Sequence, residues 1–359
     1  MDGRAGAGTG GGAGADAGVG AGARADGSAR AGAEARAEAR AGARGGAGVG
    51  VANGTFGELL QGVLPDDDRD FLVTFPITRS SRAEFRPLPA LRDVIVQPPH
   101  KTKSRRLAEH VLGALGRPGG GLLRITTTLP EGKGLASSSA DLVATARAVG
   151  ETYGIRFTGR EIEAFLRDIE PSDGVMYPGI VTFYHREVRL RERLGFLPPL
   201  TIVAHDTGGT VDTVLFNRTK RARSTTDKRE YARLLRELTA AVRDGDLRTV
   251  GAIATRSAQM HAPHAPREHF DDLLDICRDA GGLGLVLAHS GTNLGVLLAG
   301  DGAEHIDRVA HVRKACAALT GSVSVYRSLG PEPEPDGDDG PRRPEAPVTT
   351  TSAGHHPGT

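Results

Sequence analysis

The sequence predicts an α+β fold with two lobes. A strand, a loop rich in glycine and serine, and a helix follow one another between residues 124 and 149. Strands then alternate with helices between residues 200 and 327, as in a layer of helices packed on a sheet. The segment able to form a core, residues 49–329, is about 280 residues long, which exceeds the usual size of one core and favours two lobes.

A change of hydrophobic period marks the strand and the helix around the loop. In RITTTL, residues 124–129, apolar and branched residues alternate with Arg124, Thr126 and Thr128, which is the period of a half-buried strand. Beyond the loop, apolar residues recur at helical spacing, at Leu142, Val143, Ala146, Val149 and Tyr153. A strand, a loop and a helix are therefore expected in succession.

The loop itself, residues 130–136, is suited to bind phosphate. It contains Gly132, Lys133 and Gly134, and three serines follow at residues 137–139. Glycines let the backbone approach a bulky anion, and the N–H groups at a helix start attract phosphate with the help of the helix dipole. The glycine spacing differs from a Walker A sequence, which disfavours a P-loop fold. The alternative is a plain turn in which a serine caps the helix.

The string P-x-x-x-G-L-x-S-S-x-A in this loop resembles the second motif of the GHMP kinases, the family of galactokinase, homoserine kinase and mevalonate kinase. It is still more similar to the K-G-[LM]-A-S-S-[ST]-A-D version of the L-threonine kinases of cobalamin biosynthesis, which residues 133–141 fit. The second glycine of the broader family is Ala136 here. The resemblance implies that ATP binds to Gly132, Gly134, Leu135, Ala136, Ser137, Ser138 and Ser139.

Three further segments resemble the threonine kinase branch and occur in the same order. They are VANGTFGELLQG at residues 51–62, EPSDG at residues 170–174 and GLVLAHSGTNLGVLL at residues 284–298. The resemblance therefore covers residues 51–327. It implies an N-terminal ATP-binding lobe at residues 49–198 and a ferredoxin-like C-terminal lobe at residues 199–329, divided near Pro198 and Pro199.

The same resemblance assigns roles in phosphoryl transfer, which requires a phosphate cradle, a metal ligand, positive charge and a group that orients the attacking hydroxyl. Ser137 matches the family serine that binds Mg²⁺, and Asp173 matches the aspartate that accepts the hydroxyl proton. Lys133 is expected to add positive charge near the β- and γ-phosphates, although a solvated loop lysine is the plain alternative. The P-S-D-G sequence around Asp173 also predicts a turn.

Other roles stay open at this point. Many relatives carry a second magnesium ligand, a glutamate eleven or twelve residues before the aspartate, and Glu161, Glu163 and Glu170 are all candidates. An amino acid substrate needs partners for its ammonium and its carboxylate. Arg218 is a weak candidate for the carboxylate. The other substrate candidates are Glu58 and Glu170, which suit an ammonium group, together with Ser290 and Gly291.

The resulting expectation is a cytoplasmic kinase that uses ATP and Mg²⁺ to convert L-threonine to O-phospho-L-threonine. One alternative keeps the kinase and changes the acceptor to serine, homoserine or another small alcohol. The other alternative is a non-catalytic ligand sensor on the same fold. Asp173 argues against a sensor, because a sensor has no need of a proton acceptor.

Composition excludes several other classes. Net charge is +1 and no basic run is interleaved with aromatic residues, so nucleic acid is not an expected partner. No apolar run approaches the roughly 18 residues of a membrane span. The two cysteines, Cys277 and Cys316, lie in amphipathic helical patterns and are expected to be buried thiols. A homodimer is left open.

Two clusters of residues invite a function that the sequence supports only weakly. Lys101, Lys103, Arg105 and Arg106 form the densest positive cluster and are expected at a solvated helix start, with nucleotide binding as the alternative. The histidines of HAPHAPREH, at positions 261, 264 and 269, lack the ligand spacing of a metal site and are expected in a loop.

Both ends of the chain are predicted to be disordered. Residues 1–48 consist almost entirely of Ala, Gly, Arg, Asp and Glu, and residues 330–359 are rich in Pro, Gly, acids and Thr. Neither segment has the apolar residues needed to join a core.

Deleting residues 1–48 and everything after Gly330 should therefore leave stability and kcat/KM essentially unchanged. Melting temperature and steady-state kinetics of the truncated and full-length chains test this expectation. A large fall in melting temperature would overturn it.

Overall fold

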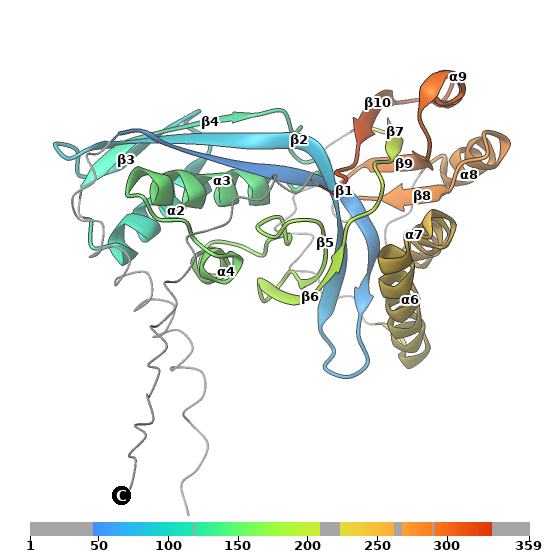
Figure 1. The fold of residues 1–359 in the computed structure, drawn as a ribbon, viewed down its shortest axis with the longest axis horizontal. Helices are drawn as coiled ribbons and strands as arrows, with labels where there is room; N and C mark the ends of the chain where they lie inside the picture. Colours follow the sequence, from blue (N-terminus) through green and yellow to red (C-terminus); the bar gives the residue numbers. More distant parts are fainter. Residues whose placement is uncertain (1–45, 118, 209–222, 262–267, 289–290, 332–359) are drawn as a thin grey trace, which may run out of the picture.

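The computed structural model describes residues 46–117, 119–208, 223–261, 268–288 and 291–331. Within these residues ten strands form one sheet, in the order β10-β7-β9-β8-β1-β2-β4-β3, and β5 and β6 continue from β2 (Figure 1). The strands are β1 (Gly48–Val63), β2 (Asp70–Leu88), β3 (Val94–Gln97), β4 (Gly120–Thr127), β5 (Ile180–Tyr184), β6 (Arg189–Gly195), β7 (Thr201–Asp206), β8 (Gly284–Leu287), β9 (Asn293–Leu298) and β10 (Ser322–Arg327). The helices are α2 (Thr102–Ala114), α3 (Ser137–Thr152), α4 (Gly159–Arg167), α6 (Thr225–Asp244), α7 (Leu247–His261), α8 (Phe270–Asp279) and α9 (Gly302–Ala317).

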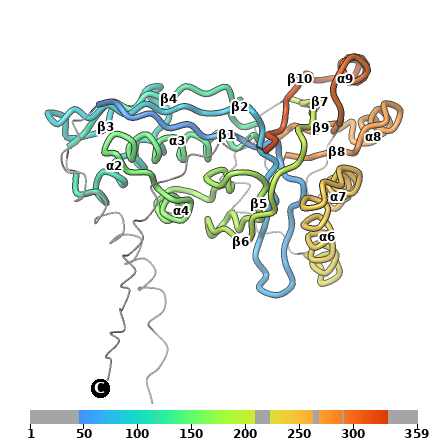
Figure 2. Tube along the Cα trace, in the orientation of Figure 1, coloured from blue at the N-terminus to red at the C-terminus, as the bar shows by residue number. Residues whose placement is uncertain are grey.

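The predicted α+β class is confirmed. The expected strand-loop-helix unit is β4, the loop and α3, and the strands and helices expected after residue 200 are β7 to β10 and α6 to α9. Figure 2 shows α3 lying along the sheet of β1, β2 and β4, with α2 beside it. Helix α3 is buried on nearly all sides because its residues are mostly small and apolar.

A long antiparallel hairpin of β1 and β2 spans the molecule, and its start corrects one expectation. Gly48 was expected in the N-terminal disordered segment, but it begins β1, is buried and pairs with Phe85. A Cβ atom on Gly48 would lie 2.3 Å from the carbonyl oxygen of Ala148, and one on Gly50 would lie 2.0 Å from that of Ala144. Glycine thus lets β1 pack directly on α3. The start of β1 resembles the preceding segment in composition, so composition alone does not reveal this contact.

Strands β1 to β6 form one set and strands β7 to β10 form the other. The two sets are joined where β1 pairs with β8, with Glu58 opposite Leu287. Gly57, next to it, has a φ of +54°, and a Cβ atom there would lie 2.3 Å from the carbonyl oxygen of Leu287. The chain crosses from one set to the other between β6 and β7, and the predicted division at residues 198–199 falls in this connection.

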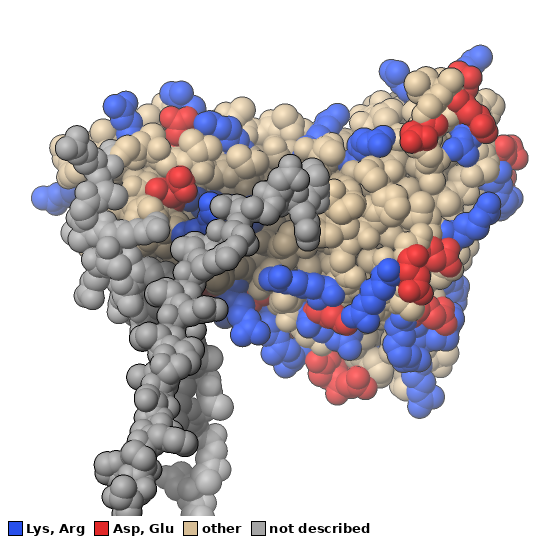
Figure 3. Space-filling view, in the orientation of Figure 1, with Lys and Arg blue, Asp and Glu red and all other residues tan. Residues whose placement is uncertain are grey.

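Surface features agree with the composition. On the face shown in Figure 3, lysine and arginine side chains are interspersed with aspartate and glutamate. Both cysteines are buried free thiols, Cys277 in α8 and Cys316 in α9. Within the described ranges, no helix combines the length and the apolar character required to cross a membrane.

Segments far apart in the sequence pack on the loop before α3. The Gly57 N–H donates to the Gly134 carbonyl at 3.2 Å, and Asn293 Nδ2 donates to the Lys133 carbonyl at 2.8 Å. Gly291 lies so close that an added Cβ atom would be 2.2 Å from the carbonyl carbon of Lys133. The loop is therefore enclosed by β1 on one side and by the segment leading into β9 on the other.

This packing predicts that Gly291→Ala destabilises the fold by about 1–3 kcal/mol, the usual cost of overpacking. Gly113→Ala is the matched control, because nothing lies within 4 Å of an added Cβ atom at this position in α2. The control should raise stability by about 0.5–1 kcal/mol through helix propensity. Chemical unfolding of both variants measures the difference, and equal stabilities would contradict the close approach.

Candidate active site

Alternating backbone conformations shape the loop into a cradle. Gly132, Gly134 and Ala136 have φ values of +69°, +73° and +54°, so every second residue is left-handed. Such alternation turns successive N–H groups toward one concave face, an arrangement that binds anions. Ala136 occupies the N-cap position of α3 and no side chain caps the helix, so the plain-turn alternative with a serine cap is wrong. The first N–H groups of α3 keep their capacity for a ligand.

The three serines after the loop differ in their surroundings. Ser137 is half-buried at the first position of α3. The Ser138 hydroxyl is exposed and donates to a Glu170 carboxylate oxygen, and the second oxygen of Glu170 accepts from Lys103 Nζ. Ser139 is buried and donates to Asp173 Oδ2 at 3.3 Å, while its oxygen accepts from the Asp173 N–H at 3.1 Å.

Asp173 lies in an extended connection after Pro171, and the chain turns only after it, where the Val175 N–H donates to the Asp173 carbonyl at 2.9 Å. Burial raises the pKa of Asp173 to about 6, the Ser139 hydroxyl opposes the rise, and the Glu170 carboxylate adds to it. A carboxylate with a pKa just below neutral is ionised at pH 7 yet basic enough to accept a proton. The structure therefore places a carboxylate suited to accept a proton beside Ser139, in the first turn of α3.

The glutamates left open by spacing separate clearly in the structure. Glu161 forms a capping box with Thr158 at the start of α4. Glu163 is buried and accepts from the Tyr177 hydroxyl at 2.8 Å and from the Leu190 N–H at 2.6 Å. Both carboxylates thus serve local structure, and only Glu170 contacts the serines.

Lys133 reaches toward the second half of the molecule. Its ammonium lies 2.7 Å from Asp206 Oδ2, at the end of β7, and 3.4 Å from the Thr292 hydroxyl, which also donates to Asp206. Burial would raise the pKa of Asp206, but the bonds from Lys133 and Thr292 outweigh it and hold the pKa below its ordinary value. Lys133 thus carries its charge at the rim of the loop.

The predicted basic cluster divides into two groups. Lys101 lies 2.5 Å from Glu131 in the loop and 2.5 Å from the buried Asp141, whose other oxygen accepts from Ser81. Lys103 pairs with Glu170, whereas both arginines are exposed. The lysines therefore belong to the site and connect the start of α2 to the loop and to α3.

The remaining predicted residues are only partly tested. Glu58 is buried at the junction of the two strand sets, and Gly291 packs on the loop, so both stay proposals for substrate contact. Ser290 and Arg218 lie outside the described residues. His264 does too, while His261 ends α7 and His269 lies 2.9 Å from Asp272. The part of the chain that the structure describes contains no group of three or more His, Cys, Asp or Glu able to hold a metal.

Sequence reasoning missed Asp206, Thr292 and the ion pair of Lys103. Asp206 was detectable as an acid at the end of a predicted strand, and Thr292 lies inside the third resembling segment. Lys103 was noticed only as part of a charge cluster, because pairing between α2 and Glu170 depends on tertiary contacts.

Comparison with known proteins supports the same assignment. Residues 103–179 match the family described as GHMP kinases N terminal domain. The L-threonine kinase of Salmonella typhimurium is 27% identical over 250 residues, covering 67% of this chain and 80% of that protein.

Solved structures show the same fold at lower identity. Homoserine kinase from Cytophaga hutchinsonii superposes with a TM-score of 0.63 at 16% identity, covering 79% of this chain and 95% of that chain. Mevalonate kinase of L. major, in complex with R-mevalonate, superposes with a TM-score of 0.59 at 18% identity and covers 79% and 96%. With the loop, the Asp173 carboxylate and the fold in agreement, the chain is similar to the GHMP kinases, and this similarity supports an ATP-dependent phosphotransferase that acts on an alcohol group.

Proposed function

We propose that the protein phosphorylates the hydroxyl of L-threonine, using ATP and Mg²⁺, to give O-phospho-L-threonine and ADP. The observation that carries the chemistry is the contact between Ser139 and Asp173, which holds a proton acceptor at the start of α3 beside the phosphate cradle. The similarity to the Salmonella L-threonine kinase supports the choice of threonine. Synthesis of the cobalamin side chain is the corresponding pathway.

The residues divide the chemistry between them. The loop backbone, with Ser138 and Ser139, would hold the phosphates, and Lys133 would place positive charge on the moving phosphoryl group. Asp173 would accept the proton of the acceptor hydroxyl as the oxygen attacks. Ser290 and Gly291, which precede β9 in the sequence, and Glu58 are the other residues proposed to contact the acceptor.

Hydroxyl and carboxylate oxygens are the protein ligands that Mg²⁺ prefers, and Ser138 and Glu170 bring one of each together. Ser137, Ser138 and Glu170 are thus the residues proposed to hold the ion. When bound, the ion would neutralise charge on the phosphates. Glu170 cannot serve at the same time as the main partner of an ammonium group, so Glu58 is the better candidate for that role.

An ADP-release assay with L-threonine, L-serine, L-homoserine and no acceptor tests the proposal. The highest kcat/KM is expected for L-threonine. A higher kcat/KM for homoserine would favour the alternative acceptor, to which the fold of the Cytophaga homoserine kinase lends support. ATP binding without turnover on any acceptor would favour a sensor.

Replacing Asp173 by Asn should abolish most turnover, because proton acceptance typically contributes about 10² to 10⁴ in rate. The same change should stabilise the protein above pH 6. Ionising a buried carboxylate whose pKa is raised from 3.8 to about 6 costs the folded state up to about 3 kcal/mol at high pH.

This cost falls as the pH drops through 6 toward 4, because the folded state then holds the proton. Denaturant unfolding at pH 8 and pH 4.5, without nucleotide or magnesium, should show the variant more stable at pH 8 and the difference shrinking at pH 4.5. A variant that keeps more than about half of wild-type kcat would remove Asp173 as the base.

The magnesium assignment predicts that Glu170→Gln raises the Mg²⁺ concentration for half-maximal activity by about tenfold or more. Ser137→Ala should act in the same direction if Ser137 also contacts the ion. Glu161→Gln is the matched control, since its capping box lies at the start of α4 and it should change stability alone. A magnesium defect in the control and none in Glu170→Gln would reverse the assignment.

A further inference from the structure

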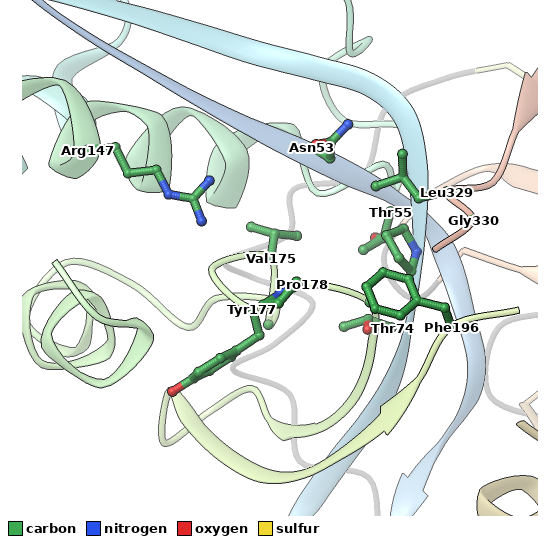
Figure 4. Close-up of a pocket in the computed structure, with 13 residues that line it drawn as sticks. Asn53, Thr55, Thr74, Arg147, Val175, Tyr177, Pro178, Phe196, Leu329 and Gly330 are labelled. Atoms are coloured by element: carbon green, nitrogen blue, oxygen red, sulfur yellow. The ribbon is translucent and has the colours of Figure 1, made fainter. Parts of the chain in front are cut away.

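A cavity of about 330 Å³ is lined in part by residues from α3, β1 and the segment that follows Asp173 (Figure 4). Gly174 and Val175, which follow Asp173, form part of its wall, so the cavity is continuous with the segment that carries Asp173. Its volume is at the lower end of the roughly 300–1,000 Å³ of small-molecule sites. The polar side chains that line it are Asn53, Thr55, Thr74, Arg147 and Tyr177.

Arg147 is the one cation among the residues that line this cavity. Figure 4 shows its guanidinium extending from α3 toward Asn53 and Val175. The group donates to the Val51 carbonyl at 2.5 Å and to the Met176 carbonyl at 3.1 Å. A guanidinium has five N–H donors, so these two bonds leave capacity for an anion. Burial lowers the pKa of Arg147, which reflects a charge with little water around it.

No carboxylate among the described residues forms an ion pair with Arg147. The bonds that Arg147 makes are to neutral carbonyls, and a half-buried guanidinium gains most from an anionic partner. Asn53 adds an acceptor nearby: its amide nitrogen donates to the Ile77 carbonyl at 3.0 Å, which leaves its oxygen for a donor on a bound molecule.

Helix α3 fixes the distance between the base and this cation. Ser139 holds Asp173, and Arg147 follows eight residues later, which at 1.5 Å per residue is about 12 Å along the helix. In a short hydroxy acid the hydroxyl and carboxylate oxygens are about 4 Å apart, and two hydrogen bonds of about 2.8 Å extend this to about 10 Å. This reach is of the same order as the distance of about 12 Å by which α3 separates Ser139, which contacts Asp173, from Arg147 along the helix.

We infer that this cavity is the acceptor site and that Arg147 binds the carboxylate of the acceptor, which makes the substrate class a short hydroxy acid with its hydroxyl at Asp173. The inference rests on the proposed kinase function and adds a residue to it. Arg147 takes the role that Arg218 was expected to fill. Neutral alcohols of the same size lack the group that Arg147 recognises.

The test compares Arg147→Gln with wild type on L-threonine and on L-threonine amide, in which a neutral amide replaces the carboxylate. Wild type should prefer L-threonine. The variant should lose about 10- to 100-fold in kcat/KM for L-threonine, mostly through KM, and little for the amide, so that the preference disappears. The KM for ATP should stay within about twofold of wild type.

Two variants separate recognition from structure. Arg147→Lys keeps the charge and should recover part of the preference for the carboxylate. Arg308→Gln makes the same chemical change in α9, where the arginine donates to the Ala299 carbonyl and does not line the cavity. It should leave the preference intact.

An equal loss on both substrates would show that Arg147 only holds Val51 and Met176 in place, and it would overturn the inference, as would an unchanged preference. Failure of the proposed function has a different signature. If wild type ignores L-threonine but phosphorylates another hydroxy acid, threonine is wrong, and Arg147→Gln is then tested on that acid and its amide. If wild type phosphorylates only neutral alcohols, the carboxylate site is overturned even though the kinase remains.

Discussion

The close packing of backbone around the loop before α3 is the constraint on which the rest of the site depends. Gly134 could not carry a side chain, because its φ is +73° and a Cβ atom would lie 2.5 Å from the Cβ atom of Ala288. Gly57 binds the loop from β1, and Gly291 and Asn293 bind it from the second half of the molecule. These contacts hold Ala136 in a left-handed conformation that costs about 1–2 kcal/mol for a residue with a side chain. The loop is thus shaped by tertiary packing as much as by its own glycines.

Carboxylates around the loop differ in function because their partners differ. Asp206 has Lys133 and Thr292 as donors and stays ionised, so it positions the lysine. Glu170 accepts from Lys103 and Ser138. A bound cation could replace Lys103 as the partner of this carboxylate. Asp173 has one hydroxyl donor and an acidic neighbour, and its raised pKa suits a base. Asp206 and Asp173 therefore differ in pKa because their burial and their hydrogen-bond partners differ.

Patterns within single segments made much of this structure predictable. The strand, loop and helix at residues 120–152 and the strands and helices after residue 200 follow from local period and motif. The start of β1 at Gly48 could not be predicted in this way. Glycine is required there by the close approach to α3, which leaves no pattern in the local sequence. Nor could the contact of Ser138 with Glu170 be predicted, since sequence distance from Asp173 does not reveal that Glu161 and Glu163, both on α4, have other partners while Glu170 lies beyond its end. The ion pairs of Lys103 with Glu170 and of Lys133 with Asp206 could not be predicted either, because they depend on which helices, strands and loops come into contact.

Helix α3 connects these parts into one rigid unit. Its first turn presents N–H groups to the loop, Ser139 holds the base, and Arg147 faces the cavity two turns later. If Asp173 and Arg147 act as proposed, α3 would select the acceptor by the distance between its hydroxyl and its carboxylate. Threonine carries the hydroxyl on the β-carbon and homoserine on the γ-carbon, so the two differ by one bond in this distance. The two amino acids are isomers of equal size, so the site would distinguish them by the position of the hydroxyl relative to the carboxylate.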